Sequence, residues 1–319
     1  MMPLSLACAL SFLLLPLPVR TLQAPNVAQT SEKTWSLAPR WTSGQVTRYQ
    51  TQTSFDLTFH TDDKEKLETT FQFGTDATLR YVVKKSESDG GLQVSVTSDG
   101  GKITDISGDT RDVPKEPANY PRLVTLNRWG TLRKLEDEGK NGKAANPLES
   151  VFDLTNLLVQ LHFLSFPDVP VKIGDTWTAK YPLPTIGKSE KSKGTKPDEK
   201  EKPEAEARNI EAKYTLLGAT KIGELDTLKI SQEATVPYTA MTDALGNLTL
   251  DPTKKAGSLT LTLTFKMVAL ILPETGQVLQ TSGVAEGEMK LEGTLAKQLP
   301  GGQVTFAGKI IALRLANRK

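Results

Sequence analysis

Two histidines, His60 and His162, and a single cysteine, Cys8, are the only residues of these types in the chain. Acid–base catalysis near neutral pH usually needs histidine or paired carboxylates on a packed scaffold. The apolar neighbours of His162 favour a structural role, and Asp62-Asp63 beside His60 favours a solvated hairpin tip over a metal site. One cysteine excludes disulfides and Cys/His metal sites. We therefore expect no catalytic residue, no metal and no cofactor.

Common catalytic motifs do not occur in the sequence. It contains no Gly-x-Ser-x-Gly elbow, His-Glu-x-x-His helix, Walker loop or dinucleotide fingerprint. Carboxylate-only chemistry, as in glycoside hydrolysis, stays open because Asp and Glu total 37. Sugar-binding sites usually display aromatic platforms, whereas the four tryptophans are expected at strand ends or in the core: Trp35, Trp41, Trp129 and Trp177. The sequence predicts a non-enzymatic protein, with a carboxylate-dependent hydrolase as an alternative.

The overall charge argues against a nucleic-acid partner. Lys and Arg total 39, so the formal net charge is +2, and no sustained basic face is visible. With 38% hydrophobic residues, the 319-residue chain is long enough for a large core. We expect a globular protein whose partners are an apolar small molecule, such as a lipid, or another envelope protein.

The N-terminus predicts export. Residues 4–19 are apolar and end in two prolines, and Leu22-Gln23-Ala24 places a small residue at a plausible cleavage point. We expect a signal peptide at 1–24 and an exported domain at 25–319, in the periplasm, the cell envelope or outside a bacterium. The absence of disulfides fits a bacterial envelope. An uncleaved membrane anchor is the alternative for the first segment.

Alternating apolar and polar residues predict a mainly β fold. The clearest case is 259–267, in which Leu or Phe alternates with Thr or Lys and Met267 ends the series. Shorter alternating runs occupy 55–59, 69–73, 92–96 and 289–291. Turn signals between runs fall at 89–91, 99–101, 245–247 and 300–302. We expect a curved antiparallel sheet or half-barrel built from hairpins.

One helix is expected within this β pattern, near 147–164. Asn146 is a suitable N-cap, Pro147 suits the first helical position, and Glu149 lies three residues after the cap. Apolar residues then recur at helical spacing. We expect the helix to pack on or in the sheet, and any apolar cleft beside it to be lined by Leu154, Leu157, Leu158 and Leu161. Completion of the core by the helix, with no cleft, is the alternative.

Two further features concern organisation. Residues 187–208 hold 13 charged residues out of 22 and are expected to form a disordered loop within the domain. Two pairs of short segments hint at related β-modules at 40–140 and 168–295. Gly44 and Gly174 both precede a strand-like segment, 130 residues apart, and Gly130 and Gly276 lie in similar turns, 146 residues apart.

The most distinctive string is 166–177, which reads Phe-Pro-Asp-Val-Pro-Val-Lys-Ile-Gly-Asp-Thr-Trp. It resembles the Pro-Val-x-x-Gly-Asp-x-Trp-like motif of an uncharacterised family of exported bacterial β-rich proteins, a domain of unknown function. The turn at 274–278 also resembles that family's late hairpin. More distantly, the chain is similar to lipoprotein carriers of the bacterial envelope. That similarity implies a sheet curled around a helix and an acyl chain bound in the concavity.

The sequence therefore predicts a non-enzymatic envelope protein that binds a lipid or other apolar ligand between sheet and helix, or serves as a structural or interaction module. An outer-membrane β-barrel is the main alternative, since export and alternating strands are common to both. Aromatic residues make up only 6% of this chain, which is low for the aromatic girdles that such barrels carry. We expect a protein that is not integral to the membrane.

Overall fold

The computed structural model describes residues 33–60, 69–104, 107–112, 122–137, 163–182, 209–242, 248–249, 255–293 and 303–315. These residues contain strands and loops but no helix. The mainly β antiparallel prediction is confirmed. The strands are β1 (Val46–His60), β2 (Thr69–Ser86), β3 (Leu92–Thr104), β4 (Thr110–Asp112), β5 (Arg122–Leu126), β6 (Leu132–Asp137), β7 (Thr176–Pro182), β8 (Asn209–Ile222), β9 (Leu225–Thr242), β10 (Leu248–Thr249), β11 (Gly257–Ile271), β12 (Val278–Gly293) and β13 (Gln303–Leu315).

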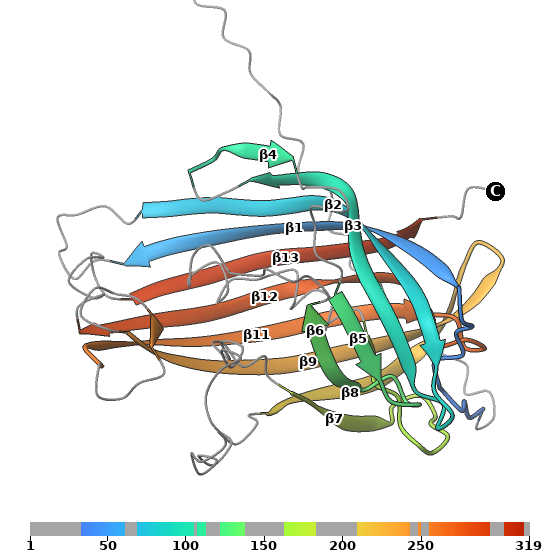
Figure 1. The fold of residues 1–319 in the computed structure, drawn as a ribbon. Coiled ribbons are helices and arrows are strands. Elements are labelled where there is room, and N and C mark those ends of the chain that lie inside the picture. The colour runs from blue at the N-terminus through green and yellow to red at the C-terminus, as the bar shows by residue number, and fades with distance from the viewer. Residues whose placement is uncertain are drawn as a thin grey trace, which may run out of the picture. The chain divides into compact units, whose positions relative to one another are not determined.

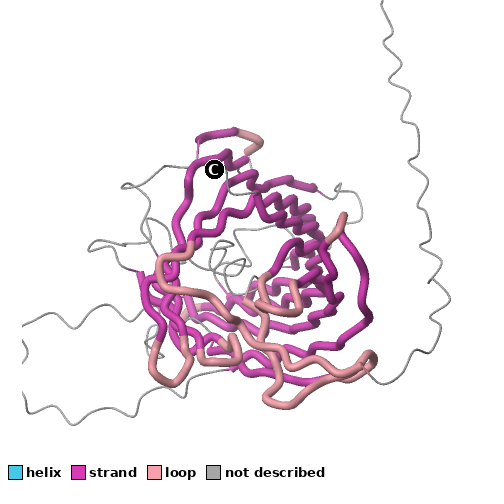
Figure 2. Tube along the Cα trace, turned by 90° about the vertical axis from the view of Figure 1, so that its right-hand side faces the viewer, coloured by secondary structure: helices cyan, strands magenta, loops and turns pink. Residues whose placement is uncertain are grey.

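All of these strands belong to one antiparallel sheet (Figure 1). Its order is β6-β5-β3-β2-β1-β13-β12-β11-β9-β8-β7, with β4 beside β3 and β10 beside β9. The strands lie within the compact unit Thr34–Lys319, and the end-on view shows that the sheet is strongly curved (Figure 2). Its end strands β6 and β7 approach each other, although no ladder joins them among the described residues. The sheet therefore has an inner and an outer face.

Sequence alternation decides which side chains point inward. Along β11, Leu259, Leu261 and Phe265 are buried, whereas Thr260 and Thr262 between them are exposed. Successive side chains of a strand point to opposite faces, so a period of two produces one apolar and one polar face. The same alternation holds in β1, β2 and β12. The inner face holds the core, in three clusters of buried side chains.

One expected turn is not a turn. Asp99 to Gly101 lies inside β3, which continues to Thr104. Across the β2–β3 pair the register shifts at this point, since Thr78 faces Gly100 and Leu79 faces Ser98. Asp99 is therefore the extra residue of a bulge. Gly100 and Gly101 have positive φ angles of 115° and 146°, so the local Asp-Gly-Gly signal bends a long strand instead of reversing the chain.

The helix expected at 147–164 is not shown. Residues 147–162 lie outside the described part of the chain, and Phe163 and Leu164, at its expected end, are not helical. Both are buried, and their segment runs on through Phe166 to the bridge between Trp35 and Val171. The charged segment 187–208 also lies outside the described residues, between the paired strands β7 and β8.

Two turns that open strands have the same hydrogen bonds. Before β1, the Gly44 amide donates to the Val83 carbonyl at 2.8 Å and the Val83 amide donates to Gln45 at 3.0 Å. Before β7, the Gly174 amide donates to Leu216 at 2.8 Å and the Leu216 amide donates to Asp175 at 3.0 Å.

Side chains at equivalent positions cap the two turns in the same way. The Gln45 Oε1 accepts a hydrogen bond from the Thr42 amide at 3.1 Å, and the Asp175 Oδ2 accepts one from the Lys172 amide at 2.9 Å. Each strand is thus anchored to its neighbour by the same arrangement.

A second equivalence links the halves of the sheet, β1–β6 and β7–β13. The Phe166 amide, in the segment leading to β7, donates to Trp129 O at 2.7 Å, in the turn between β5 and β6. The Arg40 amide, in the segment leading to β1, donates to Thr275 O at 2.9 Å, in the turn between β11 and β12. Each lead segment therefore binds a turn of the other half. We call these two contacts the reciprocal clasp.

Candidate functional site

The inner face carries an extended apolar area that we call the inner apolar surface. Its members come from β2 and β1, which pair with each other, and from β12 and β11, which also pair, and β13 lies between the two pairs in the sheet. They form two neighbouring clusters in which Phe73 and Leu263 belong to both. Its residues are Phe55, Leu57, Phe59, Phe71, Phe73, Leu259, Leu261, Leu263, Phe265, Met267, Met289 and Leu291. No member is charged.

Four of these side chains are only half-buried, and three are aromatic: Phe59, Phe71 and Phe73 beside Leu263. Phe59 and Phe71 meet edge to face, with ring centroids 5.5 Å apart and planes at 88°. Phe55 and Phe73 are stacked at 5.2 Å with planes at 16°. Both geometries are favourable for aromatic pairs. The rings thus present fixed apolar surface that is not completely covered.

Small residues on β12 face large ones on β11. The pairs are Leu263 with Gly287, Phe265 with Ala285, and Met267 with Gly283. A Cβ added at Gly287 would lie 2.7 Å from the Leu263 Cδ2, so the leucine side chain occupies the space over the glycine. Alternation of large and small residues is how the interior of a curved sheet accommodates side chains. In this sheet, the small side chains lie on β12 and the large side chains that pack over them come from β11.

The outer face of the same strands carries charged and polar side chains, with Val284 as an exposed apolar exception. Along β12, Glu286, Glu288, Lys290 and Glu292 are exposed, and each alternates with an inner residue. On β1 and β2, the outer Arg48 and Arg80 both pair with the Asp99 carboxylate of β3, at 2.7 and 3.0 Å. The outer face is therefore built to contact water.

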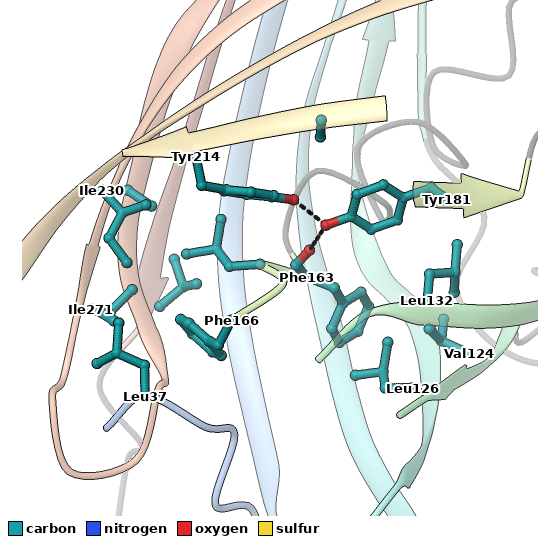
Figure 3. Close-up of a cluster of buried hydrophobic side chains, with 14 of the residues drawn as sticks. Leu37, Val124, Leu126, Leu132, Phe163, Phe166, Tyr181, Tyr214, Ile230 and Ile271 are labelled. Carbon is teal, nitrogen blue, oxygen red and sulfur yellow. Dashed lines mark hydrogen bonds between the residues drawn. The ribbon is translucent and has the colours of Figure 1, made fainter. Parts of the chain in front are cut away.

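At the other end of the strands, the inner face is covered by chain. The strap, residues 163–175, and the lead segment, residues 35–41, cross there and are joined by the Trp35–Val171 bridge. Leu37, Phe163 and Phe166 are nearly inaccessible and pack with Leu126 and Ile271 of the sheet (Figure 3). The distinctive string 166–177 therefore closes one end of the core.

Three of the four tryptophans follow the expectation for strand ends or core. Trp35, Trp41 and Trp177 are partly buried and pack against the large core cluster. The Trp177 Nε1 donates to the Ser165 carbonyl at 2.7 Å, which ties β7 to the strap. Trp129 lies in a turn, with the Arg128 guanidinium 4.6 Å from its ring centroid.

A chain of polar groups lies inside this covered end. Gln232 of β9 donates through Nε2 to the Tyr214 hydroxyl at 3.2 Å. The Tyr214 and Tyr181 hydroxyls are hydrogen-bonded to each other, and the Tyr181 hydroxyl donates to the Phe163 carbonyl at 3.4 Å (Figure 3). We call Gln232, Tyr214, Tyr181 and the Phe163 carbonyl the polar chain. The Tyr214 ring also stacks on Trp177, with centroids 5.6 Å apart.

Burial raises the pKa of four tyrosines. The pKa values of Tyr49, Tyr81, Tyr181 and Tyr214 are raised above the ordinary value, mainly because burial disfavours the phenolate. For Tyr49 the nearby Arg314 opposes the rise in pKa, and for Tyr181 the Tyr214 ring adds to it. These hydroxyls act as hydrogen-bond donors and acceptors, and not as acids, at neutral pH.

The expected cleft residues Leu154, Leu157, Leu158 and Leu161 lie outside the described residues, as does His162. His60 is the last residue of β1. Alternation in the sequence identified most of the inner apolar surface as strand residues. The polar chain was missed, because Gln232 and the two tyrosines carry no local motif that would bring them together.

No group of three or more His, Cys, Asp or Glu residues suited to a metal ion occurs in the described ranges. In the same part of the chain, no helix has the length and hydropathy needed to cross a lipid bilayer. The inner apolar surface thus offers van der Waals contact, and the polar chain offers neutral hydrogen bonds.

Comparison with known proteins leaves the family open. No family model matches the chain, and no curated protein matches it. Among solved structures, the chain is similar to OmpF of Salmonella typhi, in a complex with daunomycin, at 7% sequence identity. The alignment covers 88% of this chain and 100% of that chain, with a TM-score of 0.24. At this score the similarity does not establish a common fold.

Proposed function

We propose that this protein is an exported, non-enzymatic carrier that binds an elongated apolar ligand, such as an acyl chain, against its inner apolar surface. The observation that carries this proposal is the half-buried set of Phe59, Phe71, Phe73 and Leu263 on an otherwise buried, uncharged inner face. Export is supported by the apolar run at residues 4–19 and the small residue Ala24.

The energetics suit such a ligand. Burial of apolar surface stabilises a complex by about 25 cal/mol per Å², or about 0.8 kcal/mol per methylene. The rings of Phe59 and Phe71 are already fixed by their edge-to-face contact, so little side-chain entropy is lost on binding. The small residues Gly283 and Gly287 along β12 leave room for the Met267 and Leu263 side chains of β11, which form part of this surface.

The distribution of polarity favours a carrier over an outer-membrane barrel. Strands of transmembrane barrels place apolar residues outward and polar residues inward. The stretch of β11 and β12 that carries the inner apolar surface does the opposite, with Glu286, Glu288 and Lys290 outside and Phe265 and Met289 inside.

Native mass spectrometry of the exported protein, produced in a bacterial host from the full sequence and purified without detergent, tests the proposal. We expect an apolar molecule bound at one copy per chain, which organic extraction would release and identify. The delipidated protein should then take up parinaric acid, a fluorescent polyene fatty acid, to saturation. An empty protein that fails to take up the probe would overturn the carrier function and indicate a closed core.

Two neighbouring positions on β2 provide matched variants. Phe71→Lys places a charge on the inner apolar surface, whereas Gln72→Lys places the same charge on the exposed outer face. We expect Phe71→Lys to weaken uptake of parinaric acid at least tenfold, because a charged group on an apolar surface must stay hydrated. Gln72→Lys should bind like the unaltered protein. Equal affinities of the two variants would place the ligand elsewhere.

A further inference from the structure

The polar chain has a direction, which follows from counting its protons. Three contacts join four groups, namely Gln232 to Tyr214, Tyr214 to Tyr181, and Tyr181 to the Phe163 carbonyl. The Phe163 carbonyl can only accept a hydrogen bond, so the single hydroxyl proton of Tyr181 must be donated to this carbonyl. Tyr214 must then donate to Tyr181. The Gln232 amide must therefore face Tyr214 with Nε2, because the reverse orientation would leave two hydroxyl oxygens in contact with no proton between them.

This direction fixes what the far end of the chain can do. The Gln232 Oε1 has no hydrogen-bond partner within the described ranges, although Gln232 is only 3% exposed. A carbonyl oxygen only accepts hydrogen bonds. An unsatisfied buried acceptor is costly, and native proteins rarely retain one. The free oxygen therefore calls for a hydrogen-bond donor.

Gln232 lies next to the inner apolar surface. Its register partner on β11 is Met267, a member of that surface, and the next inner pair along these strands is Ala234 with Phe265. On the other side of Met267, the next inward-facing residue of β11 is Ala269, and its register partner on β12 is Thr281. The Thr281 hydroxyl is also buried and has no partner in the described part of the chain. The inner apolar surface thus ends beside two buried polar atoms that lack a hydrogen-bond partner among the described residues, the Gln232 Oε1 and the Thr281 Oγ1.

We infer that Gln232 receives the polar end of the ligand through Oε1, and that this end is a neutral hydrogen-bond donor such as a hydroxyl group. The inference rests on the proposed carrier function and adds the chemical class of the ligand. A carboxylate would bring a second acceptor against Oε1 and is disfavoured. A hydroxyl would donate to Gln232, while the apolar tail of the same ligand extends toward the half-buried Leu263 and Phe73.

Competition against parinaric acid tests this with three ligands of equal chain length: palmityl alcohol, its methyl ether and palmitic acid. The ether keeps the oxygen but has no proton to donate. We expect the alcohol to bind roughly tenfold more tightly than the ether, since loss of the donor leaves a buried acceptor unsatisfied. The acid should also bind more weakly than the alcohol.

The variant Gln232→Met removes Oε1 at nearly constant shape, and Gln52→Met on the exposed face of β1 is its control. With Gln232→Met the ratio of alcohol to ether affinity should fall to about one while ether binding persists, and Gln52→Met should keep the tenfold ratio. Persistent ether binding also shows that the variant is folded. An unchanged ratio in Gln232→Met, or an acid that binds best, would overturn the assignment and leave the carrier function standing. Absence of binding by all three ligands would overturn both.

Discussion

Phe55 of β1 lies directly opposite Gly308 of β13, and its ring covers the position that a side chain at 308 would occupy. A Cβ added at Gly308 would lie 2.1 Å from the Phe55 Cδ1. The ring has little room to withdraw, because it is 4% exposed and stacked on Phe73. This pair fixes the shape of the inner apolar surface where β1 meets the last strand of the chain.

Gly308→Ala should therefore lower the free energy of unfolding in urea by about 1–3 kcal/mol, the usual cost of overpacking a core. Gly218→Ala is the control, since a Cβ there would meet nothing within 4 Å and the φ angle is not positive. Adding Phe55→Leu to Gly308→Ala should recover part of the loss. If both glycine variants unfold at the same urea concentration, the contact does not restrict position 308.

Alkaline pH should unfold the protein in one cooperative step. The ordinary pKa of tyrosine is 10.0, and burial raises those of Tyr49, Tyr81, Tyr181 and Tyr214 above it. Above pH 10 the unfolded chain loses protons that the folded chain keeps, so stability falls as pH rises, by up to about 1.4 kcal/mol per pH unit for each tyrosine. Tyrosinate absorbance should increase together with loss of the far-ultraviolet circular dichroism of the sheet. Ionisation of all six tyrosines near pH 10 with an intact sheet signal would contradict this.

The reciprocal clasp should be sensitive at two glycines. A Cβ at Gly130 would lie 2.4 Å from the Leu164 carbonyl oxygen, and one at Gly276 would lie 2.7 Å from the Ala38 carbonyl oxygen. Both have positive φ angles, of 81° and 63°. Gly223 has a φ of 59° but no neighbour within 4 Å, so Gly223→Ala measures the backbone strain alone.

We expect Gly223→Ala to cost about 1 kcal/mol of unfolding free energy, and Gly130→Ala and Gly276→Ala to cost about 1–3 kcal/mol more. Thermal or urea unfolding of the three variants provides the comparison. Equal losses of unfolding free energy in all three variants would mean that the strap and the lead segment move aside at no cost when a Cβ is added.

Asp89, in the turn between β2 and β3, should titrate below the usual range for aspartate. The Gly91 amide at 2.9 Å and the Arg133 guanidinium at 3.0 Å hold the pKa of its carboxyl below the ordinary 3.8. Because the pKa of Asp89 is lower in the folded than in the unfolded chain, its carboxylate stabilises the fold at pH values above 3.8. This stabilisation is lost as the pH falls through the pKa of the folded state. Arg133→Met should raise the pKa part of the way, because the Gly91 amide remains. Carboxylate NMR titration would measure this, with Lys84→Met as control, and an unchanged pKa in Arg133→Met would refute the role of Arg133.

Alternation revealed the strands because burial follows it closely in this chain. The runs containing Phe55, Phe73 and Leu261 lie in β1, β2 and β11, with their apolar residues inward. The turn signal at Asp99 misled because a local Asp-Gly-Gly pattern does not reveal that β2 continues alongside. The polar chain could not be foreseen, since its residues come from β9, β8, β7 and the strap, and only the register brings them together.

The reciprocal clasp also bears on how the chain must fold. The turn around Gly130 is complete only when the strap from the second half arrives, and the turn around Gly276 waits for the lead segment from the first half. Contacts so distant in sequence are formed late, after costly loop closure. We therefore expect that neither half folds alone, and that local opening at one of these turns weakens the other. We also expect the amide protons of Phe166 and Arg40 to exchange as a single cooperative unit, although the two residues are 126 positions apart in the sequence.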